Sequence, residues 1–392
     1  MTHAWQVDVM DLSIATWKYD KDWVYSITYD EALADLARFV IPVHEELGIP
    51  GHVEVVAGQI GQIRDCGASS FNGMRHMNAE ELRALVEAGW GVGCHSWSHG
   101  MVMEDPDLEL RRARETIEQA VGRPVTVYCS PGSNENLTPD VLAKLPECAY
   151  LAGMSITDDI NRPAGLCFGA PSAPTHSDPR VILSAAKNLG PEKQILRCAQ
   201  NDGMDAQNDG IGAQNDGMGA QNDVWINRVP IHERYWGVFD SAFDAYKRIR
   251  QAQVERGWIV DYCHCPLEEP IHPYKDCTAA HHRERLAAVV AEGGGSCWFA
   301  NPDDVVDYRY LRRHTRIEAD GEGRFVVRVE SLPERVRCRE VSLLVTGAGT
   351  RESAVVTVDG AEVECDPTRP GALWFTVPVS DGMRISVERR KA

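Results

Sequence analysis

The stretch Gly93-Cys94-His95-Ser96-Trp97-Ser98-His99 places two imidazoles four residues apart, directly after the short apolar run Trp90 to Val92. A second stretch, Ser26-Ile27-Thr28-Tyr29-Asp30-Glu31, ends an apolar run of β-type residues in two adjacent carboxylates. Two histidines and a carboxylate are enough to hold a divalent metal ion and to leave one position open for water. A second carboxylate beside them can accept a proton from that water. The two stretches therefore predict a hydrolytic metal site, with the rest of the chain bringing them together.

Segments typical of strands and of helices alternate around these motifs. Apolar runs predict strands at 23–29, 51–56, 91–95, 125–128, 224–231, 258–263 and 296–299. The segments between them predict helices at 32–47, 79–88, 105–121, 241–255, 281–292 and 301–312, and a short one capped at 138–139. This alternation is typical of a parallel α/β fold, either a barrel or an open sheet. The loops after the strands carry the chemistry in such folds, so motifs distant in sequence can converge.

The sequence pattern changes after Arg313. Short β-rich runs at 324–329, 340–345, 354–358 and 383–387 are separated by Asp-Gly and Gly-rich turns. They predict a small all-β domain of the sandwich type. Since 392 residues are too many for one typical domain, we expect two. The first is an α/β domain over residues 1–313, and the second is the β domain over 314–392.

A low-complexity segment interrupts the first predicted domain at residues 171–223. The sequence Ala-Gln-Asn-Asp recurs in it every seven residues, starting at Ala199, Ala206, Ala213 and Ala220. A heptad coiled coil needs apolar a and d positions, which this repeat does not offer. A calcium-binding β-solenoid has a longer period that is richer in glycine. We therefore expect a disordered insertion without a role in catalysis.

Composition and charge narrow the classes of partner. The hydrophobic fraction of 43% is that of a globular protein, and the net charge of -18 argues against nucleic acid and anionic membranes as partners. No apolar run is long enough to cross a bilayer, and the first residues have no secretory signal pattern. The twelve cysteines have no framework spacing, so we expect reduced thiols and a cytoplasmic location. Cys263-His264-Cys265 has no second pair at zinc-ribbon spacing and does not predict a structural zinc site.

Four motifs, taken in order, resemble those of the polysaccharide deacetylases, the family 4 carbohydrate esterases. They are Thr28-Tyr29-Asp30-Glu31, His95-Ser96-Trp97-Ser98-His99, Ser130-Pro131-Gly132, and the apolar strand that ends at His264. The resemblance covers roughly residues 20 to 312. It implies a distorted (β/α)7 barrel, followed in some bacterial members by a β domain. It also implies metal-dependent hydrolysis of N-acetyl or O-acetyl groups, with activated water as the nucleophile and an acetylated carbohydrate or small molecule as substrate.

The resemblance also implies roles for residues of this chain. It gives a general base, a general acid, three metal ligands and a loop whose backbone holds the oxyanion. The general base is Asp30 and the general acid is His264. The metal ligands are Glu31, His95 and His99, and the oxyanion loop contains Pro131 and Gly132. The donor set suits zinc best, and cobalt, manganese or nickel also accept it.

Three positions depart from the family pattern. Glu31 stands where the family usually has aspartate, Ala32 where it has glycine, and Cys129 where it has an arginine. In the family that arginine orients the base, so we expect Asp30 to be less well tuned as a base here. The histidines at 272, 281 and 282 are expected in solvated loop and helix-start positions.

Two other functions compete with the deacetylase interpretation. One is hydrolysis of a non-sugar amide, because related barrels act on other C–N bonds. The other is a degenerate, non-catalytic protein that binds carbohydrate through its β domain. A degenerate copy need not keep both Asp30 and His264, and this chain has both. The sequence therefore favours an enzyme.

Overall fold

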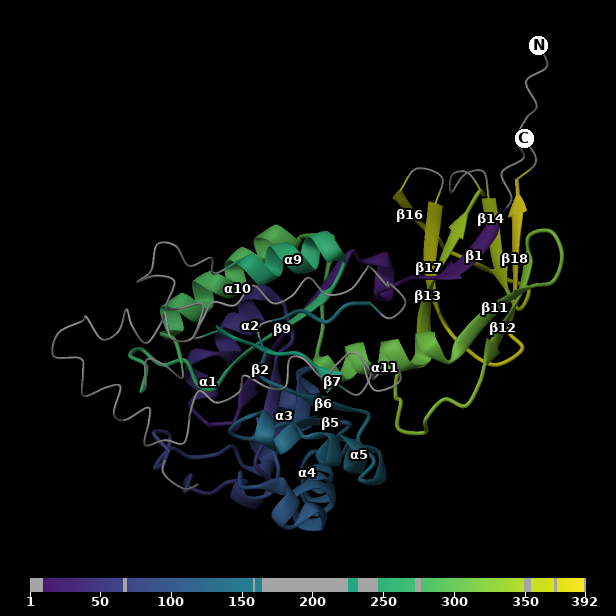
Figure 1. Ribbon diagram of the computed structural model, residues 1–392. Helices are drawn as coiled ribbons and strands as arrows, with labels where there is room; N and C mark the ends of the chain where they lie inside the picture. The colour runs from purple at the N-terminus through teal and green to yellow at the C-terminus, as the bar shows by residue number, and fades with distance from the viewer. Residues whose placement is uncertain are drawn as a thin grey trace.

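The computed structural model describes residues 10–65, 69–157, 159–163, 225–231, 246–271, 276–348, 354–369 and 372–390 (Figure 1). The low-complexity segment predicted at 171–223 lies outside these ranges. Within them, no helix combines the length and the apolar character that a membrane span requires.

A nine-stranded sheet forms the centre of the larger part. Its order is β7-β6-β5-β4-β3-β2-β9-β8, with β10 paired to β2, and every neighbouring pair is parallel. The alternating pattern of the sequence therefore predicted the sheet type correctly. The strands are β2 (Trp23–Asp30), β3 (His52–Val55), β4 (Gly91–Cys94), β5 (Val127–Cys129), β6 (Ala152–Met154), β7 (Trp225–Ile226), β8 (Val229–Pro230), β9 (Trp258–Cys263) and β10 (Cys297–Phe299).

The two ends of this strand order are consecutive in the chain. β7 pairs with β6 and β8 pairs with β9, and only Asn227 and Arg228 separate the two strands. The sheet therefore curls back on itself. The strand predicted at 224–231 is interrupted, because Asn227 and Arg228 form no ladder pair and the Asn227 N–H bonds the Asn161 side chain instead.

Helices connect the strands, as the alternating pattern predicts (Figure 1). Asn78 caps α3 with the reciprocal Glu81 contact of a capping box, and Thr138 caps α5. The helices are α1 (Leu36–Phe39), α2 (Ile41–Leu47), α3 (Ala79–Glu87), α4 (Ala113–Val121), α5 (Pro139–Glu147), α9 (Lys247–Glu255), α10 (Ala279–Gly293) and α11 (Pro302–Arg313). Short 3-10 turns are η1 (Lys18–Asp20), η2 (Ala57–Gln59), η3 (Val102–Glu104) and η5 (Asn134–Leu137), and η4 (Asp107–Arg112) is a π-helix that leads into α4.

The helix predicted from Ala32 begins four residues later. Glu31 and Ala32 have φ values of 75° and 50°, which a right-handed helix cannot contain, and Leu33 forms a bridge with His76. The chain therefore makes a left-handed turn directly after β2. This turn gives Glu31 a backbone setting different from that of a first-turn helical residue.

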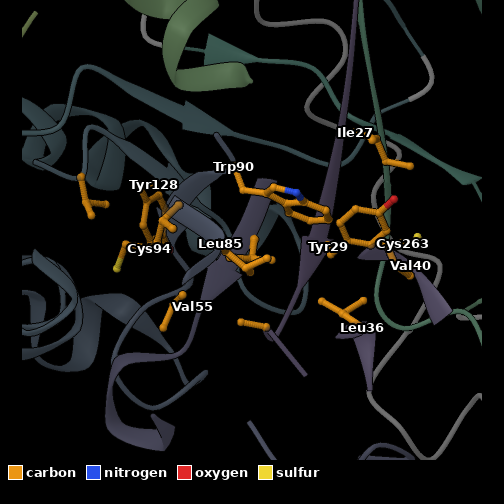
Figure 2. Close-up of a cluster of buried hydrophobic side chains, with 14 of the residues drawn as sticks. Ile27, Tyr29, Leu36, Val40, Val55, Leu85, Trp90, Cys94, Tyr128 and Cys263 are labelled. Carbon is orange, nitrogen blue, oxygen red and sulfur yellow. The ribbon is translucent and has the colours of Figure 1, made fainter. Parts of the chain in front are cut away.

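A buried cluster of apolar side chains packs between the sheet and its helices (Figure 2). Tyr29 of β2 lies beside Trp90, and its hydroxyl lies 2.7 Å from Nε2 of His44 and 2.6 Å from Nε2 of His282. His282 is fully buried, so the expectation that it is solvated was wrong. The aromatic end of β2 is thus held from two helices, immediately before the residues of the candidate site.

The β-rich part consists of two antiparallel sheets that share one hydrophobic cluster. One sheet has the order β1-β13-β17-β16, and the other β11-β12-β18-β14-β15. The first strand of the chain, β1, pairs with β13, so this part includes residues from the segment that the sequence assigned to the α/β domain. Helix α11 leads into it (Figure 1). Its strands are β1 (Asp11–Ile14), β11 (Thr315–Ala319), β12 (Arg324–Val329), β13 (Glu340–Thr346), β14 (Ala354–Val358), β15 (Ala361–Val363), β16 (Asp366–Arg369), β17 (Ala372–Pro378) and β18 (Arg384–Arg389).

Candidate active site

The predicted ligands meet at the carboxyl ends of two parallel strands. Asp30 ends β2 and is followed by Glu31, while His95 and His99 follow β4. Ligand atoms of Glu31, His95 and His99 all lie within 4.8 Å of one another, and Nε2 of His99 is 3.3 Å from Oε1 of Glu31. The structure therefore brings Glu31 to two histidines that follow it in the sequence by more than sixty residues.

His95 is oriented by a backbone contact. Its Nδ1 lies 3.1 Å from the carbonyl oxygen of Cys129, so this nitrogen carries the proton and Nε2 keeps a lone pair. Burial lowers the pKa of His95 to about 3, which keeps the imidazole neutral. A neutral ring with a fixed tautomer is the form that binds a metal ion.

Glu109 of η4 shapes the loop between the two histidines. Its carboxylate accepts hydrogen bonds from the backbone N–H of Trp97 at 2.9 Å and of Ser98 at 3.0 Å, and from the Ser98 hydroxyl at 2.6 Å. The same loop holds Ser96 and His99 at φ values of 64° and 63°. Glu109 could not be identified from the sequence, because it lies within a helical pattern and carries no motif of its own.

A buried arginine holds both oxygens of Glu31. Nε of Arg64 lies 2.7 Å from Oε2, Nη2 bonds Oε1, and Nη1 lies 2.9 Å from Oδ1 of Asn72. Burial alone would raise the pKa of Glu31, but His99 and Arg64 together hold it well below its ordinary value. The carboxylate is therefore ionised and faces the histidines, although its side chain is one methylene longer than the family's aspartate.

A second buried arginine holds Asp30. Nη1 of Arg228 lies 2.6 Å from Oδ1 and Nη2 lies 3.3 Å from Oδ2, while Sγ of Cys129 is 3.7 Å from the same Oδ1. Burial opposes ionisation, but the charge of Arg228 lowers the pKa of Asp30 below its ordinary value. The arginine missing from the third motif is therefore replaced at Asp30 by a guanidinium that reaches it from the link between β7 and β8.

Two donor groups overlap at His95. Besides the Glu31 set, ligand atoms of Asp30, His95 and Cys129 also lie within 4.8 Å of one another. Burial raises the pKa of the Cys129 thiol well above its ordinary value, and a protonated thiol is a poor ligand. One ionised carboxylate and two imidazoles are the donors that divalent first-row ions accept. The set of Glu31, His95 and His99 consists of such donors without needing a thiolate.

His264 follows β9 at the same edge of the sheet. It is half-buried and stacks on the ring of Phe71, with 4.8 Å between the ring centroids. Its loop is anchored by Asp276, whose carboxylate accepts hydrogen bonds from the backbone N–H of Cys265 and of Cys277. A positive charge on His264 also contributes to the lowered pKa of Asp30, so the two side chains lie near each other.

The Ser-Pro-Gly loop follows β5. The carbonyl oxygen of Pro131 accepts hydrogen bonds from the Ser133 N–H at 2.7 Å and from Nδ2 of Asn136 at 3.1 Å. Gly132 is exposed, has a φ of 69°, and has open space where a side chain would lie. Within the described ranges its N–H has no hydrogen-bond acceptor, so this donor is available to a ligand.

The side chains at the carboxyl ends of the parallel strands thus form a candidate hydrolytic site. Residues 18–150 match the family model described as polysaccharide deacetylase. About a third of the chain, including Asp30, Glu31, His95 and His99, therefore matches this family, and the resemblance drawn from the motifs is confirmed over that part. No curated protein matches the chain.

Solved structures with detectable similarity share few residues with this chain. A Mycobacterium smegmatis protein assigned as a polysaccharide deacetylase is 14% identical over 77% of this chain and 94% of its own, with a TM-score of 0.41. A family 4 carbohydrate esterase from Streptomyces lividans is 17% identical over 36% and 65%, with a TM-score of 0.28. A polysaccharide deacetylase from Bacillus cereus is 14% identical over 34% and 40%, with a TM-score of 0.28. The chain thus spans less than two thirds of the length of the latter two.

Proposed function

We propose that this chain is a hydrolase that removes acetyl groups, bound as amide or ester, from a carbohydrate with the help of a divalent metal ion. The observation that carries the proposal is the meeting of Glu31, His95 and His99 beside Asp30, within the segment that matches the deacetylase family. Zinc suits these donors best, and cobalt, manganese and nickel are also compatible with them. An ion bound there would polarise the acetyl carbonyl and lower the pKa of attacking water.

The side chains of the chain itself supply the remaining chemistry. Asp30, held by Arg228, takes the proton of the attacking water at a carboxylate oxygen. The N–H of Gly132 donates to the oxyanion that forms as the carbonyl carbon becomes tetrahedral. His264 gives a proton to the departing nitrogen or oxygen, because without it the nitrogen would have to leave as an anion.

The proposal includes two architectural features. One is the distorted (β/α)7 arrangement implied by the family, which the curled parallel sheet supports. The other is an accessory domain of the sandwich type, supported by two antiparallel sheets around one apolar cluster. The proposed substrate is an acetylated carbohydrate or a related small molecule, and the net charge of -18 disfavours nucleic acid.

The first experiment measures metal content by mass spectrometry in the wild type and in His99→Ala, purified identically without chelators. About one equivalent in the wild type and its loss in the variant are expected. Acetate release from acetylated amino-sugar oligomers and acetylated xylan then follows, with Asp30→Asn as the inactive control. A metal-loaded wild type that releases acetate only from non-sugar amides would redirect the assignment to another C–N hydrolase. No metal after reconstitution would reject the hydrolytic function and leave carbohydrate binding by the β-rich part to be tested.

A further inference from the structure

Arg228 is a fully buried cation in the wall of the candidate site. Besides its two contacts with Asp30, its Nη1 lies 3.1 Å from Oγ1 of Thr28 and its Nε lies 3.3 Å from the carbonyl oxygen of Ser155. The guanidinium carbon lies 4.4 Å from the centre of the Tyr262 ring. A planar guanidinium held on all sides has one orientation, and it imposes that orientation on the carboxylate it binds with two nitrogens.

The backbone of Arg228 is fixed where the sheet closes. Its carbonyl oxygen accepts a hydrogen bond of 2.8 Å from the Thr157 N–H. The preceding Asn227 donates its N–H to Oδ1 of Asn161 at 2.8 Å. Arg228 therefore extends from a bend that is hydrogen-bonded to neighbouring segments, so its side chain has a rigid base.

Cys129 and Arg228 approach the same carboxylate oxygen. The thiol is small and fully buried, and it leaves the volume beside Asp30 to the guanidinium. Two long cations at these positions would compete for one carboxylate and repel each other. The small Cys129 side chain at the head of the third motif therefore makes room for the guanidinium of Arg228 between β7 and β8.

We propose that Arg228 is the positioning residue of Asp30, an inference that rests on the proposed function. Asp30 is also a member of the donor group with His95 and Cys129, so a free Asp30 carboxylate is within reach of the metal position. By binding both of its oxygens, Arg228 holds the Asp30 carboxylate in one orientation for proton transfer. Its loss should therefore reduce turnover more than substrate binding.

Three variants test this role: Arg228→Ala, Arg228→Ala combined with Cys129→Arg, and Arg285→Ala. Arg285 is the matched control, because it is a buried arginine that pairs with Asp261 on the same strand as Tyr262. In Arg228→Ala, kcat should fall roughly 10²-fold with KM changed less than about threefold and with metal content retained. Added guanidinium should restore part of kcat, whereas the same concentration of urea should not. The double variant should recover activity relative to Arg228→Ala, because it returns a guanidinium to Asp30 from β5.

The outcomes separate the two proposals. An active wild type whose kcat is unchanged by Arg228→Ala would overturn the positioning role and leave the proposed function standing. The same holds if Arg285→Ala lowers kcat as much, since the loss would then reflect general destabilisation, which melting temperatures of both variants would show. If Arg228→Ala does not fold, the double variant decides, because its recovery depends on where the guanidinium is placed. A metal-loaded wild type that hydrolyses no acetyl substrate would overturn both.

Discussion

Arg64 binds the Glu31 carboxylate with two of its nitrogens, with Nε 2.7 Å from Oε2 and Nη2 bonded to Oε1. The carboxylate proposed as a metal ligand thus already has a cation on both oxygens. A divalent ion at this place would bind beside a fixed positive charge, which weakens its attraction in a buried setting. We therefore regard Arg64 as a residue that limits metal affinity.

Replacing Arg64 by glutamine should tighten metal binding. The guanidinium charge is removed while a side chain remains to fill part of the space, so affinity for zinc should rise about tenfold. Competition with a chromophoric chelator measures it. Arg75→Gln is the control, since Arg75 pairs with Glu81 on the surface and should leave affinity unchanged. Weaker binding in Arg64→Gln would mean that Arg64 serves mainly to hold Glu31 in place.

The two overlapping donor groups make opposite predictions for Cys129. If Glu31, His95 and His99 hold the ion, Cys129→Ala should change zinc affinity less than about threefold, whereas His99→Ala should lose most of it. The cobalt-loaded wild type should then show no thiolate charge-transfer absorption, because Cys129 is not a ligand in that arrangement. A thiolate band that disappears in Cys129→Ala would assign the ion to the other group.

Glu109 should influence the metal site without touching it. Glu109→Gln weakens three hydrogen bonds that shape the loop between His95 and His99. Loss of such outer partners typically lowers metal affinity about 10- to 100-fold. Glu115→Gln, a neighbouring surface change, is the control. Equal affinity in both variants would show that the backbone alone holds the loop.

The sequence predicts best those features that depend on local pattern. The parallel sheet follows from the alternation of apolar runs with helical stripes, and α3 follows from Asn78 and Glu81. The position of His95 and His99 follows from their place after a strand. The roles of the site residues, the division into domains and the cytoplasmic location stay predictions.

Features that depend on distant parts of the chain could not be predicted in the same way. Arg228 reaches Asp30 across 198 positions, and nothing in its neighbourhood in sequence marks it as part of a site. The pairing of β1 with β13 joins residues 11–14 to residues 343–346, and no local sequence pattern predicts it. The turn at Glu31 and Ala32 was missed because the apolar periodicity of the following helix extends back over it.

Gly93 of β4 makes room for a buried carboxylate. A methyl group at this position would overlap Oε2 of Glu54, which is fully buried on the neighbouring strand. Gly93→Ala should therefore lower the free energy of unfolding by about 1–3 kcal/mol, measured by urea titration. Gly295→Ala, with open space around it, should stay within about 0.5 kcal/mol. Combining Gly93→Ala with Glu54→Ala should remove much of the overlap, and strictly additive losses would contradict it.

His44 should make the protein less stable as the pH falls. Burial lowers the pKa of His44 to about 4, while its Nδ1 lies 3.1 Å from the carbonyl oxygen of Ile49 and its Nε2 contacts the Tyr29 hydroxyl. The unfolded chain binds a proton near the ordinary value of 6.5, and the folded chain does not until about pH 4. The neutral His44 therefore contributes fully to the free energy of unfolding above pH 6.5. As the pH falls from 6.5 to 4, this contribution of about 3 kcal/mol is lost. In His44→Gln, the free energy of unfolding, measured by urea titration across this range, should fall less steeply than in the wild type. Identical slopes would show that this imidazole is not held neutral in the core.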